Sequence, residues 1–132
     1  MKWWGKKNPD FIDVFDDVLT PEQCKHITQY LDAQEKKPGR IGDYQINTEV
    51  KECWEVYGNF SKPNWIDSLL EEKLTQYVPL YRSFHPELNN EIMIWSLDPR
   101  YNMKKYDPGM GFYAKHCEAD GASNAFRMLV WM

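Results

Sequence analysis

The chain has 132 residues, of which 42% are hydrophobic and 15% aromatic, and these figures fit one folded domain rather than a disordered segment. Its 16 basic and 20 acidic residues are interspersed and give a net charge of −4, so the composition offers no basic face for a nucleic acid. No apolar run approaches the ~20 residues of a membrane-spanning helix, and the start of the chain has no signal-peptide core. We therefore expect a cytoplasmic protein that binds neither nucleic acid nor membrane.

The first helix has a clear start signal. Residues 8–18 place aromatic residues among acids and predict a short strand or a loop. Thr20 is then a good N-cap, Pro21 suits the first helical position, and Gln23 completes a capping box, so we expect a helix over about 21–35. Its apolar face is expected to comprise Cys24, Ile27, Tyr30 and Leu31.

A second helix is predicted after a mixed stretch. Residues 40–60 combine β-branched and aromatic residues with Gly and Asn, which indicates a loop plus a short strand. Asn64 can cap the helix that follows, and Pro79 should kink or stop it near its last turn. The apolar stripe of this helix is expected to comprise Ile66, Leu69, Leu70, Leu74, Tyr77, Val78 and Tyr81.

The pattern then changes from helical to strand-like. Residues 91–97 predict a strand covered on both faces, and residues 101–106 predict a strand that runs into a turn at Pro108-Gly109. Residues 126–132 predict a further strand, within which the given chain ends. We expect the edge of this unfinished sheet to pair with a second copy in a homodimer.

Three cysteines, Cys24, Cys53 and Cys117, have no CxxC spacing, which indicates free thiols in a reducing compartment. We expect Cys117 to be a small core residue rather than a nucleophile. His26 and His85 are expected to be surface or cap histidines, not metal ligands.

His116 and Glu118 are the candidate metal ligands. Side chains two apart on a strand point to the same face, so an imidazole and a carboxylate can converge on one ion. Such a pair supplies two ligands of a 2-His-1-carboxylate triad, which leaves sites open for a co-substrate and O2 at non-haem Fe(II).

The residues around this pair carry a family resemblance. Tyr106 precedes a Pro-Gly turn, Tyr113 stands three before His116, an acid stands two after it, and Arg127 precedes an apolar run. This pattern resembles the core of the prolyl-4-hydroxylase-like 2-oxoglutarate/Fe(II)-dependent dioxygenases, whose motif is Tyr-x-x-His-x-Asp. The specific part of the resemblance covers residues 101–132, and Glu118 departs from the usual Asp by one methylene.

The resemblance implies an α+β fold and a single domain over 1–132. Helices within about 19–84 would pack on a partial double-stranded β-helix, a jelly-roll or cupin-like barrel with strands over about 91–132. The family's second histidine, and the basic residue that binds the far carboxylate of 2-oxoglutarate, lie some dozens of residues after the first His. The chain would therefore be the N-terminal part of an oxygenase domain, inactive on its own.

The resemblance also implies roles for individual residues. His116 and Glu118 would bind Fe(II), Tyr106 would hydrogen-bond 2-oxoglutarate, Tyr113 would line the iron pocket, and Arg127 would lie near the substrate mouth. The reaction implied is oxidative decarboxylation of 2-oxoglutarate with O2, coupled to hydroxylation of a C–H bond in a small-molecule or peptide substrate. Ascorbate is compatible as a further cofactor.

Two alternatives remain open from the sequence. One is a non-catalytic binding or assembly domain with a vestigial metal site, in which His116 and Glu118 are hydrogen-bonded to protein groups. The other is a metal hydrolase that binds Zn(II) or Mg(II) through His116, Glu118 and Asp120.

Overall fold

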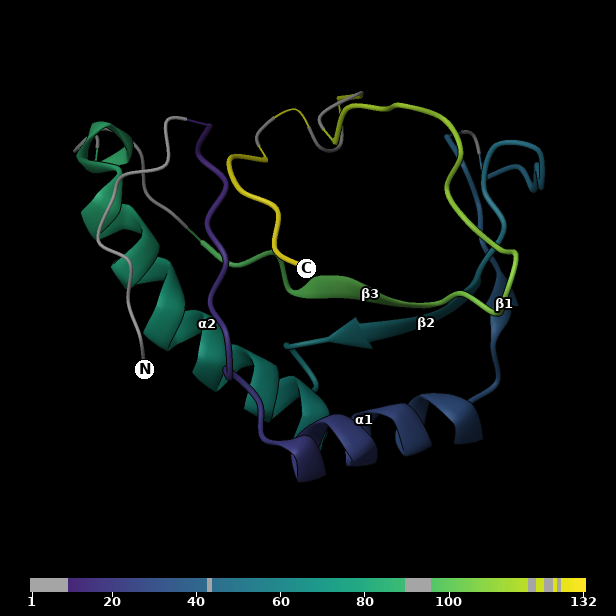
Figure 1. Ribbon diagram of the computed structural model, residues 1–132, viewed down its shortest axis with the longest axis horizontal. Helices are drawn as coiled ribbons and strands as arrows, with labels where there is room; N and C mark the ends of the chain where they lie inside the picture. The colour runs from purple at the N-terminus through teal and green to yellow at the C-terminus, as the bar shows by residue number, and fades with distance from the viewer. Residues whose placement is uncertain (1–9, 43, 90–95, 119–120, 123–124, 126) are drawn as a thin grey trace. The chain divides into compact units, whose positions relative to one another are not determined.

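The computed structural model describes residues 10–42, 44–89, 96–118, 121–122, 125 and 127–132. The elements in chain order are α1 (Pro21–Ala33), β1 (Lys37–Pro38), β2 (Trp54–Asn59), α2 (Trp65–Phe84), the 3-10 helix η1 (Pro86–Leu88) and β3 (Arg100–Lys105) (Figure 1). The strands form a small sheet in the order β1–β2–β3, in which β1 and β2 are antiparallel. The chain is therefore of the α+β class. None of the described helices is long and apolar enough to cross a membrane.

The chain packs as two compact units, each built from two separate segments. The first comprises the described parts of Met1–Glu35 and Val56–Met103, with both α-helices and η1. The second comprises the described parts of Lys36–Glu55 and Lys104–Met132, with β1 and the candidate metal ligands.

Helix α1 begins as the sequence predicts. Thr20 Oγ1 accepts a hydrogen bond from the Gln23 amide at 3.2 Å, and Gln23 Oε1 accepts one from the Thr20 amide at 2.8 Å, so the predicted capping box is confirmed. The helix ends at Ala33, two residues before the predicted end. No residue of α1 is buried, and Cys24 of the predicted apolar face is exposed.

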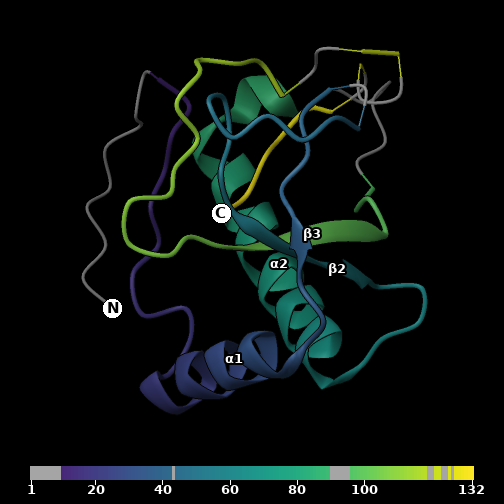
Figure 2. The same cartoon turned by 90° about the vertical axis from the view of Figure 1, so that its right-hand side faces the viewer.

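Helix α2 is capped by Asn64. Its side-chain oxygen accepts from the amides of Ile66 at 2.8 Å and Asp67 at 3.1 Å, and Asp67 Oδ2 accepts from the Asn64 amide at 2.7 Å. Asn64 Nδ2 also donates to the Tyr30 hydroxyl of α1 at 3.2 Å, at the end of α2 that Figure 2 shows beside α1. Pro79 does not stop the helix, which continues to Phe84.

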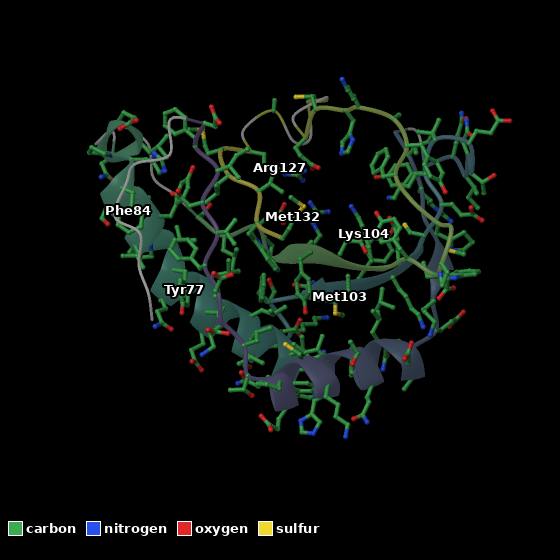
Figure 3. The ribbon with its side chains drawn as sticks, viewed as in Figure 1. Tyr77, Phe84, Met103, Lys104, Arg127 and Met132 are labelled. Atoms are coloured by element: carbon green, nitrogen blue, oxygen red, sulfur yellow. The ribbon has the colours of Figure 1, made fainter. Side chains whose placement is uncertain are left out.

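The segment before α1 packs on the C-terminal half of α2. The Phe15 ring lies 5.1 Å from Tyr77 and 6.5 Å from Phe84, two side chains that α2 presents to this segment (Figure 3). His85 caps the helix and is fully buried, with Nε2 2.7 Å from Asp13 Oδ2. The expected cap position is confirmed, but this histidine is not at the surface, because the Asp13 carboxylate meets its ring inside the unit.

The N-terminal segment is a loop rather than a strand. Residues 12–15 form no regular element, and Phe11 and Asp17 on either side have φ values of 56° and 57°. The left-handed region is incompatible with a continuous strand, so this segment forms a loop.

Tyr101 of β3 organises the core of the first unit. Its ring stacks on Phe60 at 4.8 Å, and its hydroxyl donates to Asp67 Oδ1 at 2.6 Å. Asp67 is only 2% exposed, so its carboxylate needs this donor as well as the Asn64 amide. A Cβ at Gly58 would overlap the Tyr101 ring, so the strand residue opposite must be glycine.

The strand predictions have mixed outcomes. The predicted strand after residue 100 is confirmed as β3. The strand predicted over 91–97 falls mainly on residues outside the described ones, and its last two residues, 96 and 97, are irregular. The prediction for 126–132 is wrong for 127–132, which are irregular; in the described part of the chain no backbone bridge pairs with them.

We predict that Thr20→Ala lowers the free energy of unfolding by about 1 kcal/mol, because the first turn of α1 loses its capping oxygen. Thr28→Ala is the matched control, since its hydroxyl bonds only the carbonyls of Cys24 and Lys25 within the helix. Urea unfolding should leave this control within about 0.5 kcal/mol of the wild type. Equal losses in both variants would contradict the capping role.

Tyr101 should make stability fall at alkaline pH. Burial, followed by the hydrogen bond and charge of Asp67, raises the pKa of Tyr101 far above its ordinary value. The folded state holds the phenol proton more tightly than the unfolded state does. The Tyr101 hydroxyl therefore makes its full contribution to the free energy of unfolding below about pH 10, and that contribution is lost as the pH rises further. Tyr101→Phe should therefore reduce the drop in unfolding free energy between pH 8 and pH 10.5, measured in urea. Tyr44→Phe, at an exposed position, is the control; a drop as large in Tyr101→Phe as in this control would contradict the assignment.

Candidate metal-binding site

The segment that carries His116 is fixed by backbone pairing with residues 50–52. Lys51 and Phe112 form an antiparallel bridge. The Glu52 amide donates to the Gly111 carbonyl at 2.8 Å, and the Tyr113 amide donates to the Val50 carbonyl at 2.8 Å. This pairing ends three residues before His116.

The chain enters this segment through the predicted turn. The Met110 amide donates to the Asp107 carbonyl at 2.9 Å, and Gly109 has a φ of 93°. Proline followed by a residue with positive φ is the pattern of a type II turn, so the Pro108-Gly109 prediction is confirmed. Trp54 Nε1 donates to Asp107 Oδ2 at 3.0 Å and holds the turn to the start of β2.

Lys51 is the buried charge of the second unit. It is 5% exposed and forms an ion pair with Glu55, which is 2% exposed. Its ammonium also donates to the Arg40 carbonyl at 2.9 Å and lies 5.6 Å from the centre of the Phe112 ring. Each of these contacts offsets part of the cost of burying the ammonium.

His116 and Glu118 converge, although not through strand geometry. Residues 113–118 are irregular, so the predicted strand at this position is wrong; the bridge at Phe112 is not continued. His116 Nε2 nevertheless lies 3.2 Å from Glu118 Oε1, and His116 Nδ1 lies 3.2 Å from the Ala114 carbonyl. The His116 ring stacks on Phe112 with centroids 3.9 Å apart and an angle of 8°. Both side chains are almost half exposed, at 42% and 46%.

Arg127 contacts the same carboxylate. Its Nη1 donates to Glu118 Oε2 at 3.1 Å and to the Glu118 carbonyl at 3.2 Å. The two carboxylate oxygens therefore have different partners, His116 on one and Arg127 on the other.

The separation of His116 and Glu118 fits two neighbouring ligands of one ion. Donor atoms that each lie ~2.1 Å from a metal at a right angle are ~3.0 Å apart. The observed 3.2 Å is close to this value, and it is equally the length of a hydrogen bond. Within the described residues no group of three His, Cys, Asp or Glu side chains could hold a metal ion. Asp120, the third ligand of the hydrolase alternative, lies outside the described residues.

Tyr106 and Tyr113 have other partners in the structure. Burial, and next the charge and hydrogen bond of Cys53, raise the pKa of Tyr106. The Tyr113 hydroxyl donates to the Gly109 carbonyl at 2.7 Å and so closes the turn. The structure thus brings together three of the five predicted site residues, namely His116, Glu118 and Arg127.

The cysteines are all free thiols, as predicted. Cys53 is buried, and burial raises the pKa of its thiol, while the Lys51 charge opposes that shift. Cys117 is exposed, so its predicted place in a core is wrong; the irregular backbone at this position does not turn alternate side chains inward.

His116, Cys117 and Glu118 line a hollow of about 280 Å³ on the second unit. Arg40 and Lys104 line the same hollow. Sequence reasoning did not single out these two residues, because Arg40 stands in a distant segment of the chain and Lys104, although close to Tyr106, has no role in the motif.

Comparison with known proteins finds no match: no protein-family model fits the chain, and neither a curated protein nor a solved structure is significantly similar to it.

Arg127 and a metal ion should compete for Glu118. We predict that Arg127→Gln raises the affinity for Mn(II) by up to about fivefold, the range of a solvent-exposed ion pair. Electron paramagnetic resonance of free Mn(II) measures this directly. Arg100→Gln is the control, since Arg100 pairs with Asp98 in the other unit. Weaker binding by Arg127→Gln than by this control would show that Arg127 does not block a ligand position.

Proposed function

We propose that the chain is part of a 2-oxoglutarate- and Fe(II)-dependent oxygenase, with His116 and Glu118 as two of its iron ligands. The observation that carries the proposal is the 3.2 Å separation of His116 Nε2 and Glu118 Oε1, which suits adjacent ligands of one ion. An imidazole and a carboxylate are also the donor types of the facial triad.

The local sequence pattern supports the same assignment. The type II turn at Pro108-Gly109 stands where the family resemblance requires a Pro-Gly turn, between Tyr106 and Tyr113. An α+β fold is compatible with helices that support a jelly-roll barrel, and we propose that barrel for residues from about 91 onward. Three free thiols are consistent with the reducing cytoplasm, which we propose as the compartment.

Each residue of the site would have a definite task. Stacking on Phe112 fixes the plane of the His116 ring and so presents Nε2 to the ion. Glu118 would supply an anionic oxygen, and Arg127, which bonds the second oxygen, would compete with the ion for that carboxylate. Fe(II), if bound there, would supply the chemistry that couples O2 and the oxidative decarboxylation of 2-oxoglutarate to hydroxylation of a C–H bond. The hollow beside these residues gives room for the co-substrate or substrate.

A second candidate function is a non-catalytic binding or assembly domain. One observation favours it: Glu118 accepts hydrogen bonds from Arg127 through both its side chain and its carbonyl, and its other oxygen faces His116. These contacts satisfy the carboxylate without an ion.

Metal titration separates the two functions. We predict that the chain binds Fe(II) anaerobically, that 2-oxoglutarate tightens the binding, and that His116→Ala and Glu118→Ala each weaken it at least about tenfold. Isothermal titration calorimetry measures all three effects. The matched control is His26→Ala, because His26 is an exposed histidine of α1.

The remaining outcomes point elsewhere. Binding of Zn(II) or Mg(II) in clear preference to Fe(II) would favour the hydrolase alternative. Fe(II) affinity that is equal in wild type, His116→Ala and His26→Ala would exclude His116 as a ligand and leave the binding domain.

A further inference from the structure

The hollow beside His116 and Glu118 is lined by cations from two other parts of the second unit. Arg40 follows β1 and Lys104 belongs to β3, from which its side chain stands out in Figure 3. The volume of about 280 Å³ is close to the lower end of ligand pockets, at roughly 300 Å³, and suits a small molecule.

The described side chains around this hollow do not neutralise its positive charge. Among the described residues neither Arg40 nor Lys104 forms an ion pair. Glu118 is the acidic residue of the lining, and its carboxylate is already engaged by Arg127 at 3.1 Å and His116 at 3.2 Å. One guanidinium group and one ammonium group thus remain available for one anion.

Lys104 is exposed, so its ammonium is accessible to a ligand from solvent. The Lys104 ammonium also lowers the pKa of the Cys53 thiol, against the larger effect of burial. The other nearby ammonium, that of Lys51, is buried and paired with Glu55.

One wall of the hollow is held in a fixed arrangement. Phe112 is bridged to Lys51 through the backbone, lies under the Lys51 ammonium and stacks on His116. The lining therefore combines the apolar side chains of Ile41, Val50 and Phe112 with the two cations, and this combination suits an anion with an apolar or hydroxylated body.

We propose that this hollow binds the oxyanion group, carboxylate or phosphate, of a small organic substrate through Arg40 and Lys104. Arg40 offers a planar fork that can bind two oxygens together, and Lys104 offers a point charge to the same group. The body of the substrate then lies toward His116 and Glu118. That this anion is a substrate rests on the proposed function, whereas its binding does not.

Calorimetric titration in metal-free Tris buffer at low salt tests the binding alone. The probes are glycerate, glycerol 3-phosphate and glycerol, which share a body and differ in charge. We expect both anions to bind with dissociation constants on the order of millimolar and glycerol not to bind. The anion that binds with the lower dissociation constant identifies whether the hollow prefers a carboxylate or a phosphate.

The substitutions Arg40→Gln and Lys104→Gln should each weaken anion binding by about fivefold to tenfold, and added salt should weaken anion binding further. Lys37→Gln removes an exposed lysine of β1 outside the lining and should remain within about twofold of wild type. Circular dichroism confirms that the variants fold. Glycerol binding as tight as the anions, no binding of either anion to wild type, or equal affinities in Arg40→Gln and Lys37→Gln would overturn the proposal.

The failure of anion binding and the failure of the proposed function can be told apart. Anion binding without any Fe(II) binding would support the site but overturn its assignment to an oxygenase substrate. Fe(II) binding through His116 without anion binding would leave the proposed function standing and refute the inference.

Discussion

The buried ammonium of Lys51 is the constraint on which the candidate site depends. It is taken out of water and held by Glu55, the Arg40 carbonyl and the face of Phe112. Removing one member of a buried pair typically costs about 3–5 kcal/mol, because the other charge is left without a partner. The same residue pairs through its backbone with Phe112, so one residue connects the segments before β2 and after β3.

The candidate ligands lie just beyond this fixed point. The backbone pairing ends at Tyr113, and the order of the next residues depends on side chains instead: the Phe112 ring against His116, and Arg127 on Glu118. Such contacts are individually weak at almost half-exposed positions, so an ion could replace them at small cost. The arrangement is therefore suited to exchange between an ion-paired and a metal-bound form of Glu118.

Local signals made part of this structure predictable. Thr20 and Asn64 were recognised as caps because a cap depends on residues within one turn, and the Pro108-Gly109 turn is specified by the dipeptide itself. The strand expected over 126–132 is not seen for 127–132, since a strand forms only by pairing with another segment, and the local sequence does not specify that segment. The burial of His85 likewise depends on Asp13, which is distant in the sequence.

The site shows the same division. The spacing of His116 and Glu118 predicts their convergence, but an irregular segment brings them together, not a shared strand face. Arg127 was identified from the motif, but its hydrogen bonds to Glu118 were not foreseen. Arg40 and Lys104 could not be found at all, because only the fold of the second unit places them on one hollow.

Proton NMR of the imidazole rings during addition of Mn(II) shows whether His116 is a metal ligand. The chain has three histidines, so three sets of ring signals report on all candidates in one spectrum. Mn(II) shares the ligand preferences of Fe(II) sufficiently to occupy the same site, and it broadens the signals of nearby protons. If His116 is a metal ligand, its ring signals broaden at lower Mn(II) concentrations than those of His26 and His85. Equal broadening of all three, or none at His116, would contradict it.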